Sequence, residues 1–365
     1  MSGVHSSGLG RWPQAVQWLL LFGGGIAIAR AMEIAHLPAA LLLGPLVWGA
    51  ALAMRGTSVR IGRLPHLFGQ AIAGTLIANS LDPQVLTRTL ELWPVVLLFV
   101  VLTLVLACAV GLGAAKVSRL DREVTVWGFL PGMAGTMIAL AHERGIDSRM
   151  VAFIQILRLL MVIGAMVAVG AVLVGPAVPH GAGAAPPDLV STLSVLALSA
   201  LGIGVALVLP MVPAGASLVP LFIGGALCVN GINLASPHWL IALGYLMLGA
   251  HVGLRFTPEM IRIGARALPM LALAVVVLLL LCGATGALLS VVAGVDLMSA
   301  MLATVPGSID SIALIALSTG SDISFIMTLQ TVRLFAVVLL GPPLARGILH
   351  LARRLSPEPG RNSAE

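Results

Sequence analysis

The sequence repeats itself after 175 residues. Shifting the chain by that distance aligns its halves without a gap, so that PGMAGTMIALAHERGIDSRMVAFIQILRLL (131–160) meets PGSIDSIALIALSTGSDISFIMTLQTVRLF (306–335). Chance matches in apolar sequence would be Leu, Ala or Val, but six of the eight identical positions in these two blocks hold Pro, Gly, Asp, Gln or Arg. A fixed period of this kind indicates one structural unit used twice. Whatever fold the first half adopts, the second half must adopt as well.

Apolar residues dominate both copies. Of the 365 residues, 59% are hydrophobic and only 9% are charged, whereas a soluble domain carries roughly 25% charged residues. Several apolar runs reach the roughly 20 residues that a helix needs to cross a bilayer. The sequence therefore predicts an all-α polytopic integral membrane protein with about 10–12 hydrophobic helices. The lipid bilayer is its expected partner, and whether it forms a homo-oligomer stays open.

Five regions follow from the repeat and the apolar runs. They are a cytoplasmic N-terminal tail (1–14), a first membrane repeat (15–174), a connecting loop (175–188), a second membrane repeat (189–349) and a cytoplasmic C-terminal tail (350–365). The two tails leave little room for a DNA-binding domain. We therefore expect no direct binding of nucleic acid.

Positive charge changes sides between the two copies. Short loops with an excess of Lys and Arg face the cytoplasm. In the first copy these residues gather in the second and fourth loops: Arg55, Arg60, Arg63, Lys116, Arg119 and Arg122. In the second copy they gather in the third loop and the tail: Arg255, Arg262, Arg266, Arg346, Arg353, Arg354 and Arg361. This swap predicts inverted-topology repeats in a bacterial inner (plasma) membrane, with both termini cytoplasmic. Inversion requires one segment in each copy that does not cross fully.

The best candidates for these segments are the two that contain Pro131-Gly132 and Pro306-Gly307. Proline removes an amide donor from a helix, and glycine frees its backbone. Lipid cannot satisfy the backbone groups that such a break exposes, so the break must line protein or a water-filled cavity. Paired broken or re-entrant helices in corresponding halves mark the substrate site of secondary transporters. A packing kink is the alternative interpretation.

Each broken segment is followed by a tight turn. Gly145 and Gly320 suit a helix C-terminus that needs a positive φ angle. Asp147 and Asp322 suit the N-cap of the next helix, where a carboxylate accepts free amides. We interpret these four residues as structural caps.

Arg158 and Arg333 lie inside the apolar helices that follow the caps. Each is about eleven residues past its cap, roughly 16 Å along the helix and so near the middle of the bilayer core. Gln155 and Gln330 precede them by three residues and share their helix face. Three roles fit these arginines: clamping the carbonyl groups freed at the break, binding an anionic ligand, or snorkelling to an interface.

Asp310 is the one acidic residue deep in an apolar segment, and its counterpart in the first copy is Gly135. Two arginines against one aspartate leave a net positive charge in the core, which favours an anionic ligand over a cation. Asp310 could pair with either arginine or carry a proton. Thr136 and Ser311, matched across the copies, could offer hydroxyl groups to a substrate or cap a half-helix.

Motifs of enzymes and metal sites are missing from the sequence. The eight histidines are scattered, with no HExxH and no Cys/His cluster, and the three cysteines show no CxxC spacing. We therefore expect no catalytic residues, no metal, no cofactor and no enzyme activity.

Four stretches carry a resemblance to a known family: LLLGPLVWGALAMRG, GQAIAGTLIANSL and the two aligned blocks quoted above. Over about 15–350 the chain resembles the AbrB-like duplicated membrane-protein family, whose members are labelled membrane regulators or ammonia monooxygenases. The family usually has an acidic residue five positions after the proline of the break, where this chain has Thr136 and Ser311. The regulator label implies an indirect effect on gene expression, and the monooxygenase label conflicts with the missing metal motifs.

The leading hypothesis is a secondary-transporter-like carrier of a small metabolite. An anion is one candidate for this metabolite. Its site would lie near the membrane midplane, at the two Pro-Gly breaks and the two Gln-x-x-Arg helices. The alternative is a membrane sensor or regulator that binds a ligand in the same place without transporting it. The sequence does not identify the ligand.

Overall fold

The computed structural model describes residues 9–131, 134–175, 188–209, 212, 214–232 and 234–355, so most of both expected tails and of the connecting loop lies outside the described residues. After a 3-10 helix at Leu9–Arg11, the first repeat forms α1 (Gln14–Ile34), α2 (Ala40–Met54), α3 (Arg63–Ala78), α4 (Pro83–Glu91), α5 (Trp93–Ser118), α6 (Arg122–Phe129), α7 (Ala134–Glu143) and α8 (Ser148–Leu173). The second forms α9 (Leu189–Val208), α10 (Gly215–Val229), α11 (His238–Gly253), α12 (Pro258–Gly264), α13 (Leu268–Ala293), α14 (Leu297–Thr304), α15 (Ile309–Thr319) and α16 (Ile323–Leu355).

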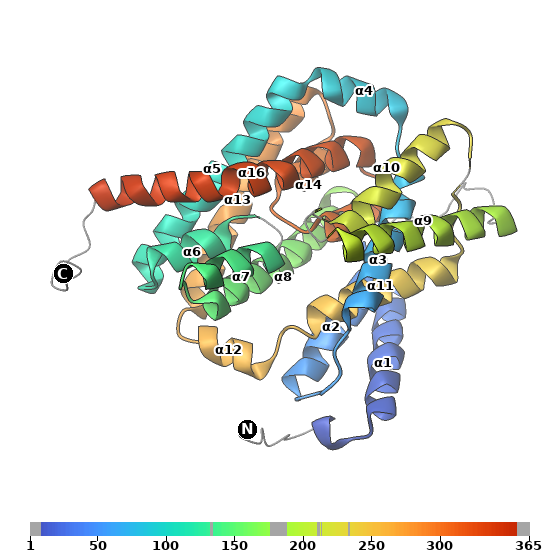
Figure 1. Ribbon diagram of the computed structural model, residues 1–365, viewed down its shortest axis with the longest axis horizontal. Coiled ribbons are helices and arrows are strands. Elements are labelled where there is room, and N and C mark those ends of the chain that lie inside the picture. Colours follow the sequence, from blue (N-terminus) through green and yellow to red (C-terminus); the bar gives the residue numbers. More distant parts are fainter. Residues whose placement is uncertain are drawn as a thin grey trace.

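The helices confirm the predicted all-α membrane fold. The part of the chain that the structure describes contains no strand (Figure 1). Six of its helices are long and apolar enough to cross a membrane, or seven if α11 and α12, bent by 47° at their junction, form one span. The helices α2 and α10 are apolar but shorter, with 15 residues each. The chain is a polytopic membrane protein.

The duplication appears in the bounds of the helices. The pairs α2 and α10, α3 and α11, and α5 and α13 each begin and end 175 residues apart. Unusual backbone conformations repeat with the same offset: Ala39 and Ala214 have φ angles of 55° and 52°, and Gly56 and Gly231 have φ angles of 78° and 84°. The two halves therefore share local conformation as well as sequence.

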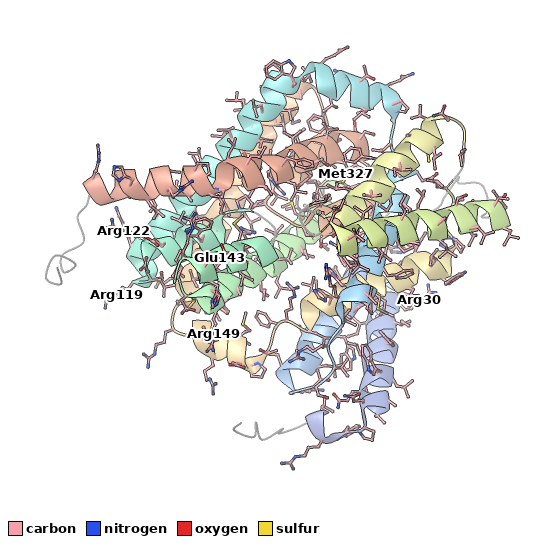
Figure 2. All side chains as sticks on the ribbon, viewed as in Figure 1. Arg30, Arg119, Arg122, Glu143, Arg149 and Met327 are labelled. Carbon is pink, nitrogen blue, oxygen red and sulfur yellow. The ribbon has the colours of Figure 1, made fainter. Side chains whose placement is uncertain are left out.

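Both described termini lie at one end of the molecule, which we call the termini end, where the loop between α2 and α3 and the start of α8 line one pocket. The amide of Leu9 donates to the carbonyl of Arg55 (3.3 Å), between α2 and α3. Near the other terminus, Nη1 of Arg122 donates to the carbonyl of Ala352 (3.3 Å). Figure 2 shows Arg119, Arg122 and Arg149 on this side of the molecule.

Another set of hydrogen bonds defines the opposite end, which we call the far end. The amide of Asp82, between α3 and α4, donates to Oγ of Ser324 at the start of α16 (2.7 Å). The amide of Leu234, between α10 and α11, donates to Oδ1 of Asn79 (3.3 Å). Between the two ends the chain passes through α1, α2, α3, α5 and α8, and then through α9, α10, α11, α13 and α16.

The two repeats run in opposite directions. The helix α1 begins at the termini end, next to the contact of Leu9 with Arg55. The corresponding helix α9 ends there, because the carbonyl of Ala206 near its C-terminus accepts a hydrogen bond from Arg63 (3.1 Å). Five passes in each repeat leave the second copy upside down relative to the first, as the charge pattern predicts.

The broken segments are the ones that do not cross. In the second repeat, the amide of Asp322, just after α15, donates to Oγ of Ser299 in the first turn of α14 (2.7 Å). The segment therefore enters from the far end along α14 and returns to it along α15. In the first repeat, the guanidinium of Arg144, just after α7, lies over the ring of Trp127 in α6 (4.9 Å). We call α6 with α7 the first hairpin and α14 with α15 the second hairpin.

Helices from both repeats interleave in two bundles. The first bundle contains α1, α2, α3, α9, α10 and α11; the second contains α5 to α8 and α13 to α16, and α4 and α12 connect the two (Figure 1). In the first bundle α2 packs directly on α11, because a methyl group at Gly249 or Gly253 would overlap with the carbonyl of Leu42 or Leu46. The two copies are thus joined backbone to backbone.

Candidate functional site

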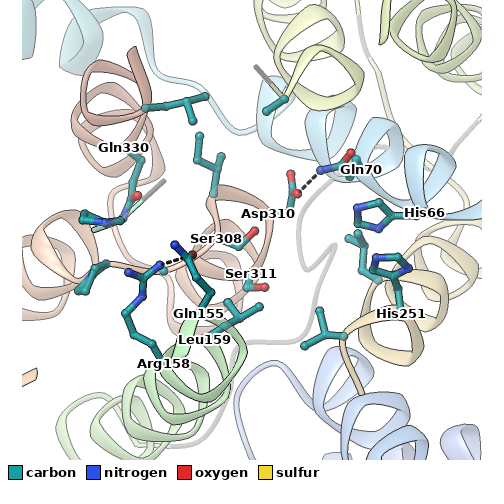
Figure 3. A pocket seen from close by; sticks show the side chains of 18 of the residues that line it. His66, Gln70, Gln155, Arg158, Leu159, His251, Ser308, Asp310, Ser311 and Gln330 are labelled. Carbon is teal, nitrogen blue, oxygen red and sulfur yellow. Dashed lines mark hydrogen bonds between the residues drawn. The ribbon is translucent and has the colours of Figure 1, made fainter. Parts of the chain in front are cut away.

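A cavity of about 330 Å³ lies between the two bundles. Its walls come from α3 and α11 of the first bundle and from both hairpins, α8 and α16 of the second (Figure 3). Nine residues singled out in the sequence line this cavity: Pro131, Gln155, Arg158, Pro306, Gly307, Asp310, Ser311, Gln330 and Arg333. Residues 175 apart in sequence therefore meet around one space.

Each hairpin has a stretch of extended backbone at its tip. The helix α6 ends at Phe129, and Leu130 has φ −60° and ψ 121°; α14 ends at Thr304, and Val305 has φ −68° and ψ 138°. A helix end leaves up to four carbonyl groups without a partner inside the helix. In a membrane interior these groups need donors from other side chains.

In the first repeat the donors come from α8. Nε2 of Gln155 donates to the carbonyls of Trp127 (3.2 Å) and Leu130 (3.3 Å), and Nη1 of Arg158 donates to that of Phe129 (2.6 Å). Nη2 of Arg158 also donates to Oε1 of Gln155 (3.2 Å), which fixes the two side chains together.

The second repeat uses the same arrangement on α16. Nε2 of Gln330 donates to the carbonyls of Leu302 (2.7 Å) and Val305 (3.5 Å). Arg333 donates through Nη1 to Val305 (2.6 Å), through Nη2 to the carbonyl of Gly307 (3.2 Å), and also to Oε1 of Gln330. In both copies the arginine thus clamps the broken helix, one of the three roles that the sequence left open.

The two clamps differ in how many donors they use. Nε of Arg158 is buried and has no hydrogen-bond partner among the described residues, whereas Arg333 donates to two backbone carbonyls. Both side chains line the cavity and are only 5% exposed. Arg158 therefore retains hydrogen-bonding capacity that Arg333 has largely committed to the hairpin.

Asp310 lies in the first turn of α15 and is 5% exposed. Its Oδ2 accepts a hydrogen bond from Nε2 of Gln70 in α3 (2.9 Å), a contact that joins the two bundles. Oδ1 has no hydrogen-bond partner, and within the described part of the chain Asp310 forms no ion pair with either arginine. The hydroxyl of Ser217 in α10 interacts with this carboxylate and also donates to the carbonyl of Ala214 (3.2 Å). The N-terminus of α15, with its free backbone amides, favours a negative charge at this position.

Several cavity residues were missed by the sequence analysis: His66, Gln70, His251, Arg255 and Ser308. The rings of His66 and His251 stack with their centroids 3.9 Å apart and an angle of 14° between them. Nη2 of Arg255 lies 2.7 Å from Nε2 of His251. The available signal was weak: His66 and Gln70 are polar residues one helical turn apart in a short, apolar helix.

The remaining predicted residues lie away from the cavity or outside the described residues. Gly145 and Gly320 end α7 and α15 with φ angles of 70° and 65°. Oδ1 of Asp147 accepts from the amides of Arg149 (3.0 Å) and Met150 (3.2 Å), and Oδ1 of Asp322 accepts from that of Phe325 (3.0 Å). Gly132 lies outside the described residues, and Thr136 is on α7 with a side chain that the structure does not describe.

Metal-ligating side chains do not gather at this site. Among the residues that the structure describes, no three His, Cys, Asp or Glu side chains are grouped so as to hold a metal ion. Cys108 and Cys282 are buried among apolar side chains, and Cys228 is partly buried.

Comparison with known proteins gives the family. The family model described as "Transition state regulatory protein AbrB" matches residues 41–349. The chain belongs to the AbrB family. It is 36% identical over 346 residues to "Putative regulator AbrB" of Escherichia coli (strain K12), which covers 93% of this chain and 99% of that protein. This AbrB-family chain is also 24% identical over 303 residues to "Uncharacterized protein YhjN" of Bacillus subtilis (strain 168), covering 78% of each. No solved structure matches it significantly.

Proposed function

We propose that this AbrB-family protein is a membrane carrier that moves a small solute through the cavity between its two bundles. One observation carries the proposal: both hairpin tips and both Gln-x-x-Arg pairs meet at the same cavity, against the helices α3 and α11 of the other bundle. Inverted repeats with interrupted helices at a shared site are the architecture of many secondary transporters.

The contact between the bundles supports alternating access. Among the described residues at the cavity, the hydrogen bond between Gln70 and Asp310 joins the two bundles. The helix α15 of the second bundle packs on α3 of the first. A movement of one bundle against the other needs to replace few polar contacts. Such a movement would expose the cavity first at one end of the molecule and then at the other.

The same proposal places the protein in a bacterial inner membrane with both termini in the cytoplasm. The loops that contain Arg60 and Arg255 line one pocket, so their positive charge is on the same side. Reporter fusions at residues 60 and 260 test this placement. Both fusions should report the cytoplasm, and opposite sides would overturn it.

A sensor that binds a solute without moving it is the second candidate. It is favoured by the names of the family and of the Escherichia coli relative, both of which call the protein regulatory. Regulation of gene expression would then follow indirectly from occupancy of the cavity. This candidate and the carrier share the binding site and differ only in flux.

Binding and flux must therefore be measured on the same preparation. A thermal-unfolding screen of purified protein in detergent, with carboxylates, phosphates, amino acids and amines, identifies a stabilising compound. Radiolabelled counterflow of that compound into proteoliposomes then tests transport. The carrier is supported if Arg158→Gln abolishes this flux and Arg88→Gln, on the exposed α4, preserves it. Binding without flux selects the sensor.

A further inference from the structure

A second cavity adjoins the first. It has a volume of about 550 Å³ and lies at the termini end, between the loop with Arg60, the start of α8 and the helix α12. Two residues line both cavities, His251 and Arg255. We call the second cavity the vestibule. A solute that moves from the vestibule into the first cavity, which we call the inner cavity, passes this pair of side chains.

The charge along this path is strongly positive. The vestibule is lined by Arg60, Arg149 and Arg255 with one carboxylate, Glu259. The inner cavity adds Arg158 and Arg333 with Asp310. Clefts lined by charges of one sign, with low-dielectric walls, concentrate solutes of the opposite sign.

His251 and Arg255 set the chemistry at the place where the two cavities meet. Arginine remains protonated and only donates, so Nε2 of His251, 2.7 Å from Nη2 of Arg255, must be the acceptor. The ring of His66 stacks on the face of the His251 ring. The hydrogen bond to His251 has one charged partner, whereas an oxyanion brings a second charge and can accept two parallel hydrogen bonds from the guanidinium. An arriving oxyanion can therefore replace His251 as the partner of Arg255.

We propose that Arg255 is an anion-selective gate between the vestibule and the inner cavity, and that the solute is a small oxyanion. This inference rests on the proposed carrier function, for which it names the substrate class and the entry path. Arg255 holds the anion at the gate and passes it to the region of Arg158, which has a buried donor without a partner. Cations are rejected at the vestibule, before they reach Asp310.

Thiol modification tests the gate without knowledge of the natural solute. Ser308 lines the inner cavity, is partly exposed and makes no capping hydrogen bond, so Ser308→Cys places a thiol beyond the gate. The background variant carries Cys108→Ala, Cys228→Ala and Cys282→Ala. Two reagents of similar size are compared by intact-protein mass spectrometry: anionic sulfonatoethyl methanethiosulfonate and cationic trimethylammonioethyl methanethiosulfonate. For each reagent, the rate of reaction with the protein thiol is divided by its rate of reaction with a small free thiol in solution.

We expect the normalised rate to be at least about tenfold higher for the anionic reagent. Arg255→Gln should bring the ratio close to one, whereas Arg262→Gln, a charge change on α12 outside both cavities, should leave it unchanged. High salt should reduce the preference, since it screens exposed charges. A ratio near or below one in the Ser308→Cys protein overturns the gate, as does a preference that survives Arg255→Gln.

Two controls keep this test decisive. If Ser308→Cys or its background does not fold, as judged by thermal unfolding, Ser311→Cys in the chain with native cysteines replaces it, with the unsubstituted chain as the measure of background reaction. The flux assay separates the two proposals. Anion preference without flux supports the gate and rejects the carrier, whereas flux of a cationic solute supports the carrier and rejects the gate.

Discussion

The arginines inside the membrane act on the backbone. Arg158 and Arg333 are buried, and each donates at 2.6 Å to a carbonyl freed at a hairpin tip. The cost of placing a guanidinium in the membrane core is thus offset partly by the backbone groups that it satisfies. Clamping and ligand binding are compatible for Arg158, because a guanidinium has five donors and the clamp uses two of them.

Lysine substitutions should separate these contributions. Arg333→Lys removes the fork that reaches Val305 and Gly307 together, so we expect a loss of roughly 1–3 kcal/mol in the free energy of unfolding. Arg158→Lys should cost less stability, because Arg158 holds a single carbonyl, but it should weaken solute binding more. Denaturant unfolding in detergent and binding titration measure the two effects. Equal stability losses would contradict the difference between the two clamps, and losses no larger than that of exposed Arg262→Lys would contradict the clamp itself.

At the level of elements, the interleaving of the repeats rests on close helix contacts. Gly253 in α11 touches the backbone of α2, where an added methyl group would meet the carbonyl of Leu46. Gly204 in α9 has no neighbouring atom within 4 Å of such a methyl group. Two glycines in helices of the same bundle therefore face different environments.

Alanine at these two glycines should have opposite effects. We expect Gly253→Ala to destabilise the protein by roughly 1–3 kcal/mol through overpacking. Gly204→Ala should be neutral or stabilising by up to about 1 kcal/mol, since alanine has the higher helix propensity. Thermal unfolding of both variants in the same detergent checks the contrast. Equal stability of the two variants would show that α2 and α11 do not pack through this contact.

The sequence predicted what is local or duplicated. The breaks, the capped turns and the Gln-x-x-Arg pairs follow from spacing within one copy, and the inversion follows from the loop charges. The gate was not predictable in this way, because His66 and His251 belong to different copies and meet only once α3 and α11 pack together. Their sequence counterparts, Ile241 and Leu76, are apolar, so the repeat gave no indication of them.

For the whole molecule, the far end offers a place to stop the bundles from moving. The amide of Asp82 and Oγ of Ser324 are 2.7 Å apart, which brings their Cα atoms within the usual reach of a disulfide. We expect the oxidised Asp82→Cys, Ser324→Cys protein to bind solute from the termini end but to lose most of its flux. Reduction should restore transport, and each single variant should transport under both conditions. Undiminished flux through a cross-linked protein would exclude a carrier that opens at this end.

The duplication is symmetric in its helices but not in its gate. At the positions that correspond to His251 and Arg255, the first repeat has Leu76 and Ser80. Were the bundles to move so that the cavity opened at the far end, its mouth would have neither the guanidinium nor the imidazole. The two faces of the membrane would then present entrances of unequal affinity, and transport from the side with Arg255 would be half-saturated at a lower solute concentration than transport from the other side.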